Sequence, residues 1–319
     1  MKKIFNILKT SILVIIIGIF CLYSIQGCCA KTPSLKFAQI SDAHFSTLEN
    51  DTSYKVLKSS SLILNDAITQ VNSTQNIDFT IFTGDLINKP NECELLKFIA
   101  CANLLNYPWY PVLGNHDINP CGTLNKQKYF DIICGHNKNF CYKNSYYSFT
   151  PKKGYKVIVL DTIMDDKICS NGKLSEEQLV WLKDELSNSK NDIVLIFTHV
   201  PIIEPYPSEN HRLLNSYELK LLLKKYKNPI IVCSGHYHAT KIVQEDNILY
   251  IETPSLVTYP CAFRIINIQP LRKKILVDVY LKDTRLKELQ DLAKSKCFGA
   301  PLLYGQEADR TYTYEIVRN

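Results

Sequence analysis

The stretch Pro111-Val112-Leu113-Gly114-Asn115-His116-Asp117 is a strand-like apolar run that stops at a glycine and continues with three polar residues. A strand end holds side chains firmly, and glycine lets the backbone come close to a ligand. The amide oxygen of Asn115 can coordinate a metal ion, and His116 can donate a proton if Asp117 orients it. An ordinary turn would give the same pattern, so the residues at the other strand ends are needed to distinguish a catalytic site from a turn.

Two earlier strands are expected to end in the same way. The apolar run 35–40 leads into Asp42 and His44, which point the same way in an extended segment and could hold one ion together. The run 77–83 leads into Asp85, a carboxylate that is costly to bury unless it meets charges or donors. Bridging two metal ions would meet that need. A polar loop at the first position and a loop-capping Asp at the second are the alternatives.

Two later strands, expected over 193–197 and 229–233, also end in histidines. His199 follows the first, and His236 and His238 follow the second. Two His residues spaced i, i+2 in an extended segment share a face, which favours a metal pair over chance. Five of the seven His residues fall at strand ends, so chance placement is a poor explanation.

Apolar strands alternate with amphipathic helices, the arrangement of a layered α/β fold whose ligands sit beyond the carboxyl ends of the strands. Helices are expected over 51–72 and 92–105. Another should begin at Ser175, with Gln178 completing a capping box. The insertion 118–146 is expected to shape substrate entry.

The amino terminus has the composition of an export signal. Residues 1–10 are basic, 11–25 are almost wholly apolar, and Ile25-Gln26-Gly27-Cys28 resembles the lipidation site of a bacterial lipoprotein, although Gln26 is unusual there. A cleaved signal peptide and an uncleaved anchor are the alternatives, and all three place the protein outside the cytosol. Many cysteines in an exported chain could form disulfides, whose pairing the sequence does not give.

Three segments are expected: a signal over 1–29, a catalytic domain over 30–281, and a helix and strand extension over 282–319. The formal net charge is +6, and part of it lies in the signal, so the remainder is too mild and too dispersed to indicate a nucleic-acid partner. The chain is 319 residues long and 46% hydrophobic, enough for one large core.

Side by side, the strand ends read Asp42-x-His44, Gly84-Asp85, Gly114-Asn115-His116-Asp117, His199 and Gly235-His236-x-His238. Their order and spacing resemble the calcineurin-like metallophosphoesterase family over about residues 35–270. The resemblance implies a β-sandwich flanked by helices. It implies that one metal ion is held by Asp42, His44, Asp85 and His238. It implies that the second is held by Asp85, Asn115, His199 and His236. His116 would face the substrate off the metals, with Asp117 orienting it.

Two divalent ions would attract a phosphate and lower the pKa of a bridging water, giving hydroxide near neutral pH. His116 would stabilise charge on the phosphate or protonate the leaving alkoxide. Nitrogen and oxygen ligands without thiolate suit Mn, Fe or Zn without choosing among them. We therefore predict a hydrolase of phosphate mono- or diesters that acts outside the cytosol, anchored to a membrane or secreted. A surface protein of the same fold that binds phosphorylated ligands without turnover is the alternative.

The sequence does not identify the natural substrate. Segment 202–212 is expected to wall the pocket, and Tyr206, His211 and Arg212 could touch a leaving group, with a solvated loop as the alternative. The sequence has no basic stripe with interleaved aromatic residues, the pattern that would indicate a nuclease. The expected partners are a small-molecule or other phosphoester substrate and, through the amino-terminal lipid or anchor, a membrane.

Overall fold

The computed structural model describes residues 32–142, 144–164 and 166–317. The chain from Pro33 onward forms one compact unit, and the expected signal over 1–29 lies outside the described residues. Among the described residues, no helix is both long enough and apolar enough to cross a membrane.

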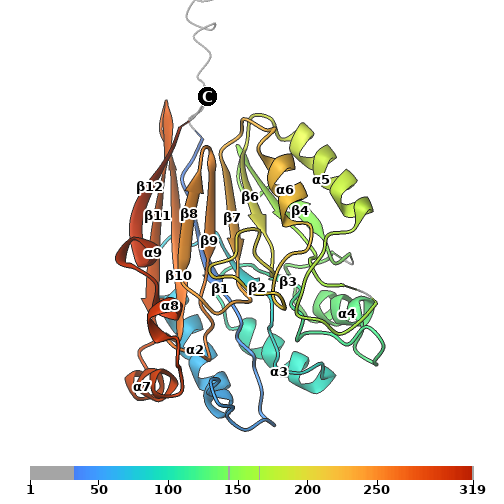
Figure 1. Cartoon of the computed structure of the whole chain (residues 1–319), viewed down its shortest axis with the longest axis vertical. Coiled ribbons are helices and arrows are strands. Elements are labelled where there is room, and N and C mark those ends of the chain that lie inside the picture. The colour runs from blue at the N-terminus through green and yellow to red at the C-terminus, as the bar shows by residue number, and fades with distance from the viewer. Residues whose placement is uncertain (1–31, 143, 165, 318–319) are drawn as a thin grey trace, which may run out of the picture. The chain divides into compact units, whose positions relative to one another are not determined.

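Two six-stranded sheets form the centre of this unit (Figure 1). The strand order of the first sheet is β12 (Thr311–Val317), β11 (Lys274–Asp283), β10 (Ala262–Pro270), β1 (Leu35–Ile40), β2 (Phe79–Thr83) and β3 (Trp109–Val112). The order of the second is β4 (Tyr147–Phe149), β5 (Tyr155–Val159), β6 (Ile193–Phe197), β7 (Ile230–Ser234), β9 (Ile248–Glu252) and β8 (Lys241–Glu245).

The two sheets pack face to face through aromatic side chains. The ring of Phe37 in β1 is stacked on Phe79 in β2 at a centroid distance of 5.2 Å, and it meets Phe197 in β6 edge-on at 5.5 Å. Strands β1, β2 and β3 are parallel to one another, as are β5, β6, β7 and β9. Parallel strands place their carboxyl ends at one edge, so the polar residues that follow them gather there.

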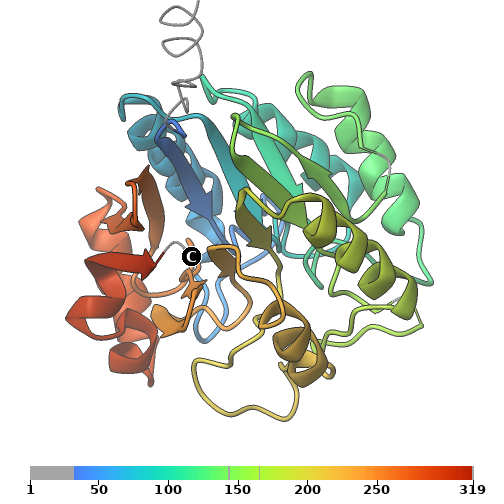
Figure 2. The same cartoon turned by 90° about the horizontal axis from the view of Figure 1, so that it is seen from above.

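Helices cover the outer faces of the sandwich (Figures 1 and 2). The first sheet is covered by α2 (Ser60–Asn72) and α3 (Glu92–Ala102), with α4 (Lys126–His136) beside α3. The second sheet is covered by α5 (Glu176–Asn188) and α6 (Ser216–Leu223). The expected helix-flanked, layered α/β sandwich is therefore confirmed.

Two local expectations were wrong, and the insertion 118–146 contains the helix α4. The helix expected from residue 51 begins only with a 3-10 turn at η1 (Leu57–Ser59), because the backbone N–H of Lys55 bonds to the Thr52 hydroxyl and closes a turn instead. Ser175 does cap α5 by accepting from the Gln178 N–H, but the Gln178 side chain bonds to the backbone of Asp161 rather than closing a capping box.

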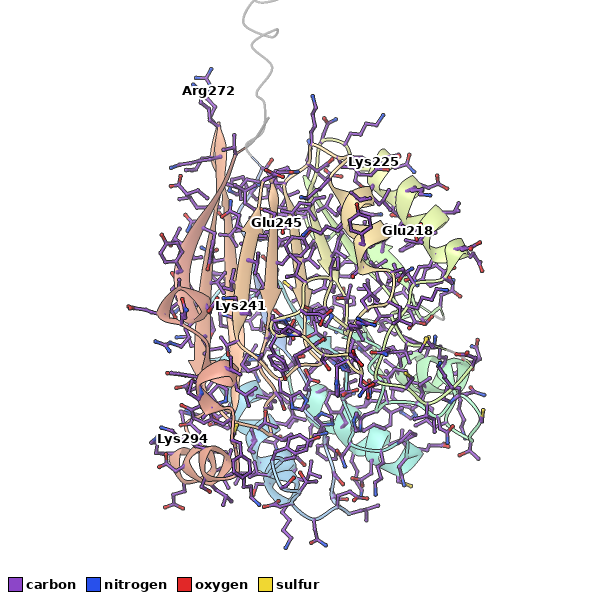
Figure 3. The ribbon with its side chains drawn as sticks, viewed as in Figure 1. Glu218, Lys225, Lys241, Glu245, Arg272 and Lys294 are labelled. Carbon is purple, nitrogen blue, oxygen red and sulfur yellow. The ribbon has the colours of Figure 1, made fainter. Side chains whose placement is uncertain are left out.

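The segment after residue 282 adds α7 (Lys287–Ser295), α8 (Ala300–Tyr304), α9 (Glu307–Arg310) and the edge strand β12. This segment bonds to residues 240–242, which follow His236 and His238 after β7. The N–H of Thr240 donates to the Leu303 carbonyl, and the N–H of Ile242 donates to Asp309 Oδ1. Lys241, at the start of β8 (Figure 3), lies 3.5 Å from the Asp309 carboxylate. The nine cysteines among the described residues are free thiols.

Candidate metal centre

All seven predicted metal ligands lie together, just past the ends of β1, β2, β3, β6 and β7. The ligand atoms of six of them lie in overlapping groups within 4.8 Å: Asp42, His44 and His238; Asp85, His199 and His236; and His44 with Asp85, a pair that His116 joins without being a predicted ligand. Asn115 joins them through its side-chain oxygen, 3.1 Å from His199 Nε2. We call these seven ligand residues the metal cluster.

Close approach of backbone segments makes this convergence possible. A Cβ atom at Gly114 would lie 2.0 Å from the backbone nitrogen of Asp85, and one at Gly235 would lie 1.8 Å from the Ser41 hydroxyl and 2.4 Å from Asp42 Oδ2. No side chain fits at either position without moving the cluster. The two glycines are therefore part of the site.

The backbone of the cluster is strained. Positive φ angles, uncommon outside glycine, occur at Asp42 (50°), His44 (39°), Asp85 (51°), His236 (75°) and His238 (56°). Such conformations cost about 1–3 kcal/mol each and persist where the surrounding structure enforces them. The sandwich stabilises five ligand residues in unfavourable conformations so that their side chains converge.

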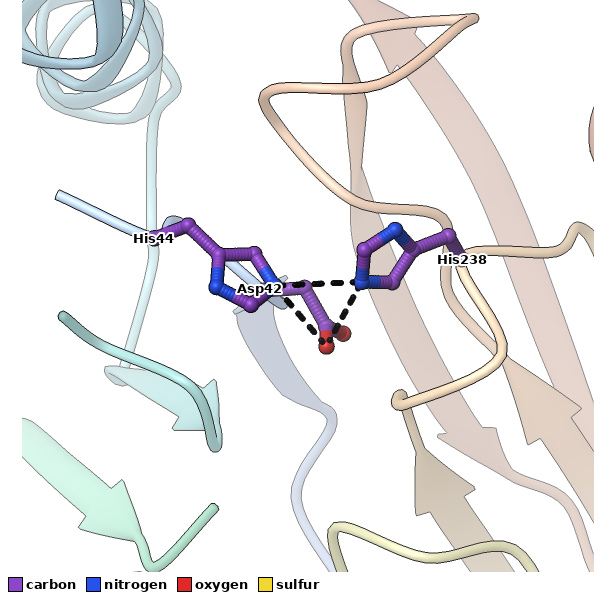
Figure 4. Close-up of side chains that lie close together, drawn as sticks. All are labelled: Asp42, His44 and His238. Atoms are coloured by element: carbon purple, nitrogen blue, oxygen red, sulfur yellow. Dashed lines mark hydrogen bonds and ion pairs between the residues drawn. The ribbon is translucent and has the colours of Figure 1, made fainter. Parts of the chain in front are cut away.

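Asp42, His44 and His238 form the first half of the cluster (Figure 4). His238 Nε2 lies 3.1 Å from His44 Nε2 and 3.3 Å from Asp42 Oδ1. The other carboxylate oxygen, Asp42 Oδ2, accepts hydrogen bonds from the Ser41 hydroxyl at 2.5 Å and the His236 N–H at 2.9 Å. These bonds fix the carboxylate with Oδ1 facing the imidazoles.

Asp85 stands between the two halves. Its Oδ2 lies 3.5 Å from His44 Nε2, and its Oδ1 lies 3.4 Å from His199 Nε2. Oδ1 also accepts a hydrogen bond of 2.8 Å from the backbone N–H of His116. One carboxylate thus presents one oxygen to each half, an arrangement that would let two ions share it.

Asn115, His199 and His236 form the second half. His199 Nε2 lies 3.1 Å from His236 Nδ1, the same distance as to the Asn115 oxygen. His199 Nδ1 lies 2.8 Å from the carbonyl oxygen of Thr83. That carbonyl accepts the Nδ1 proton and leaves Nε2 free to bind a metal.

The cluster attracts positive charge. Burial acts to lower the pKa of His199, but the carboxylates, Asp85 above all, raise it to about 10. Burial acts to raise the pKa of Asp85, but His199 and His116 hold it well below its usual range. Burial, with Lys55 nearby, holds the pKa of His44 well below its usual range. The carboxylates therefore stay ionised, and the His44 imidazole has little tendency to neutralise them by taking up a proton.

The donor set fits two divalent cations. Asp42 Oδ1 is buried without a hydrogen-bond partner among the described residues and faces the imidazoles. The facing imidazole nitrogens of His44 and His238 lie 3.1 Å apart, and a cation bound by both would use both lone pairs. Nitrogen and oxygen donors without thiolate suit Mn, Fe or Zn.

His116 lines the pocket beside the cluster, as predicted, but its partner differs from the prediction. His116 Nδ1 lies 2.7 Å from the carbonyl oxygen of Asn88. Burial lowers the pKa of His116. The carbonyl accepts the Nδ1 proton, which leaves Nε2 to exchange a proton with a ligand in the pocket.

Asp117 does not orient His116, and no hydrogen bond joins their side chains among the described residues. The Asp117 carboxyl accepts hydrogen bonds from the backbone N–H groups of Gly114 at 2.8 Å and Ile87 at 3.1 Å. Burial and the neighbouring Asp85 raise the pKa of Asp117 to about 8. Asp117 therefore ties together the two loops that carry Asp85 and His116, and acts as scaffold.

A pocket of about 410 Å³ opens beside the cluster. Beyond the cluster and His116, it is lined by Tyr54, Lys55, Ser170, Tyr206, Pro207, Ser208, His211 and Tyr237. Tyr206 and His211 thus lie where the sequence suggested, whereas Arg212 does not line the pocket.

Sequence reasoning missed Tyr54 and Lys55. Both lie in the turn that replaces the start of the expected helix, and no motif marks them. Lys55 is 3% exposed, and its Nζ lies 3.2 Å from His44 Nδ1. Burial lowers the pKa of Lys55 to about 8, against the attraction of Asp85 and Asp42.

Known proteins share this architecture. A sequence profile of the calcineurin-like phosphoesterase family matches residues 35–240. The manganese-dependent ADP-ribose/CDP-alcohol diphosphatase of Arabidopsis thaliana is 24% identical over 263 residues, covering 67% of this chain and 83% of the relative. A probable cyclic nucleotide phosphodiesterase of Colwellia psychrerythraea is 26% identical over 245 residues, covering 74% and 83%. The crystal structure of a dimetal phosphatase from Danio rerio has a similar fold, with a TM-score of 0.60 at 17% identity over 78% of this chain and 99% of that one.

The chain belongs to the calcineurin-like phosphoesterase family. It is a metal-dependent phosphoester hydrolase whose cofactor is a pair of divalent metal ions. The family prediction from the strand ends is confirmed.

Proposed function

We propose that the metal cluster hydrolyses the phosphoester of a small molecule that enters the 410 Å³ pocket. The observation that carries this proposal is the convergence of the seven predicted ligand side chains from five strand ends, with His116 beside them on the pocket wall. Bound at these residues, two divalent ions supply positive charge that attracts a phosphate and lowers the pKa of water.

Each residue then has a defined task. Asp42, His44 and His238 hold one ion and Asn115, His199 and His236 hold the other. Asp85 is shared between them, since its two oxygens face the two halves. The Thr83 carbonyl keeps the ligating nitrogen of His199 unprotonated, and the Ser41 and His236 donors orient Asp42.

His116 is the proposed general acid. The Asn88 carbonyl holds its Nδ1 proton, so protonation occurs at Nε2, toward the pocket. An imidazolium there stabilises charge on the phosphate and can give its proton to the leaving oxygen. General acid catalysis of this kind is worth about 10²–10⁴-fold in rate.

The relatives suggest the kind of ester. Two are named as a diphosphatase of ADP-ribose and CDP-alcohols and as a cyclic nucleotide phosphodiesterase. We propose that this chain likewise acts on a small phosphate ester or anhydride. The pocket has room for a molecule of nucleotide size.

We further propose that the enzyme works outside the cytosol. The support is the basic segment 1–10, the apolar segment 11–25 and the Ile25-Gln26-Gly27-Cys28 sequence. Export with lipidation predicts that the mature chain begins at Cys28 and carries a lipid, which a Cys28→Ser variant would lack. Mass spectrometry of the mature amino terminus distinguishes this outcome from simple cleavage, and a chain that keeps Met1 in the cytosol would contradict export.

The direct test is hydrolysis of two chromogenic substrates, 4-nitrophenyl phosphate and bis(4-nitrophenyl) phosphate, with Mn²⁺, Fe²⁺, Zn²⁺ or a chelator. We expect turnover that requires metal, and a His116→Ala variant about 10²–10⁴-fold slower. His136→Ala is the matched control, because His136 is an exposed histidine outside the pocket lining. Metal-loaded protein that hydrolyses neither ester would contradict the proposal and support a binding role.

A further inference from the structure

Lys55 is a buried cation without a carboxylate partner. It is 3% exposed, and no ion pair joins its ammonium to an Asp or Glu among the described residues. Its polar contact is with His44 Nδ1, at 3.2 Å. Buried lysines are rare unless they are paired, so this side chain calls for an explanation.

The contact with His44 does not survive metal binding in its present form. His44 Nε2 faces Asp85 Oδ2 at 3.5 Å and His238 Nε2 at 3.1 Å, so Nε2 is the nitrogen that faces the metal cluster. A neutral imidazole that binds metal through Nε2 carries its proton on Nδ1. Nδ1 is then a donor, and the Lys55 ammonium beside it has no acceptor there.

An anionic ligand bound in the pocket would supply a hydrogen-bond acceptor for the Lys55 ammonium. Lys55 lines it together with His116, Asn115 and Asp85. The side chain projects from the turn 52–55, which is closed by a 3.0 Å hydrogen bond from the Thr52 N–H to the Lys55 carbonyl. A phosphate bound at the cluster brings anionic oxygens to this wall of the pocket.

We propose that Lys55 binds a phosphate oxygen of the substrate and favours esters whose phosphate groups carry two negative charges. This inference rests on the proposed phosphoesterase function. The preferred substrates are then phosphomonoesters or diphosphates rather than phosphodiesters with one charge.

Charge complementarity gives the reason for this preference. Two divalent ions exceed the two carboxylates Asp42 and Asp85 in charge, and Lys55 adds a further positive charge to the same pocket. A dianionic phosphate neutralises more of this excess than a monoanion does. A phosphomonoester is dianionic above a second pKa of about 6, whereas a simple diester carries one charge.

A purely structural role for Lys55 makes a different prediction. If Lys55 only positioned His44, its removal would weaken metal binding and slow both kinds of ester equally. If Lys55 only filled space beside the cluster, Met would replace it without effect. Selectivity between the two charge classes separates the proposed role from the other two, and the absolute rates and the metal affinity separate those two from each other.

The experiment uses the full chain loaded with Mn²⁺ and three variants. Lys55→Met removes the charge, Lys55→Arg retains it, and Lys58→Met is the matched control on an exposed lysine three residues away. The measurements are binding of inorganic phosphate and of dimethyl phosphate by calorimetry, and kcat/KM for 4-nitrophenyl phosphate and bis(4-nitrophenyl) phosphate. Metal affinity and melting temperature are measured alongside.

We expect Lys55→Met to weaken phosphate binding about tenfold or more, because a charge-assisted hydrogen bond is lost. The ratio of monoester to diester kcat/KM should fall by a similar factor, about tenfold, and recover in Lys55→Arg to within about threefold. Lys58→Met should match the wild type. Should Lys55→Met not fold, Lys55→Gln gives the same comparison with a smaller neutral side chain.

Equal losses for both esters, or an unchanged ratio, would overturn the inference for Lys55. Either result is distinct from failure of the proposed function, in which the wild-type protein hydrolyses neither ester. Unchanged phosphate affinity in Lys55→Met would also overturn it, whatever the rates.

Discussion

The inner wall of the pocket, taken together with the predicted ligands that contact it, consists mainly of buried side chains at strand ends, whereas much of the outer wall consists of exposed side chains on loops. Asp85 and His236 on the inner wall are 2% and 7% exposed, and Asp42, His44 and His199 behind them are each 0% exposed. On the outer wall, Tyr54 is 48% exposed, and His211 is exposed on the loop before α6. Burial and strand attachment hold the first wall in place, whereas the second is held by contacts between loops, such as the hydrogen bond from the Tyr206 hydroxyl to the Tyr237 carbonyl.

This difference separates chemistry from selection. The inner wall has strained backbone at five ligand residues, which a folded core can maintain and a mobile loop cannot. The outer wall offers rings and hydroxyl groups that suit many leaving groups. We infer that changes to the inner wall remove activity, and that changes to the outer wall alter which ester is used.

The largest effect is expected for Asp85→Asn. The change removes the negative charge that both halves of the cluster share, so we expect kcat/KM to fall about 10³-fold or more, by analogy with the loss of other preorganised charges. Metal content, measured by plasma mass spectrometry, should fall with it. Asp291→Asn, on an exposed Asp of α7, is the matched control. Activity within tenfold of wild type would break the distinction between the walls.

A smaller effect is expected for Gly235→Ala. The added Cβ would meet the Ser41 hydroxyl and Asp42 Oδ2, so the first half of the cluster must shift. We expect metal affinity to fall about 10–100-fold, as when support around ligands is disturbed. Gly135→Ala is the control, because nothing lies within 4 Å of a Cβ at that position. Calorimetric titration with Mn²⁺ measures both, and equal affinities would show that the close packing is dispensable.

The smallest effect is expected for His211→Ala on the outer wall. The His211 ring centroid lies 5.4 Å from that of His236, and no hydrogen bond links the two side chains among the described residues. We expect KM to rise about two- to fivefold with kcat nearly unchanged, the sign of lost uniform binding. Arg212→Ala tests the neighbouring residue, which does not line the pocket. A large fall in kcat for His211→Ala would place catalytic function on the outer wall.

The inner wall could be predicted from sequence because its residues obey a simple rule. Each follows an apolar strand, and the carboxyl ends of parallel strands gather at one edge of a sheet. Knowing that Asp42, Asp85 and His199 each end such a strand was enough to place them together. The closely approaching Gly114 and Gly235 belong to the same motifs.

The outer wall and the supporting contacts could not be predicted in this way. The apolar spacing from Leu57 onward fits a helix, but no cap marked its start, so Tyr54 and Lys55 were placed inside it. Asp117 follows His116 in the chain, which suggested a pair, yet the carbonyl of Asn88, far earlier, holds the imidazole. Partners brought together only by folding leave no local pattern.

The central claim is that two metal ions bind at the strand ends with Asp85 shared between them. Anomalous X-ray diffraction from crystals soaked in Mn²⁺ tests it most directly. We predict two anomalous peaks about 3.5–4 Å apart, one beside Asp42, His44 and His238 and one beside Asn115, His199 and His236. A single peak, or peaks away from these residues in fully loaded crystals, would contradict the claim.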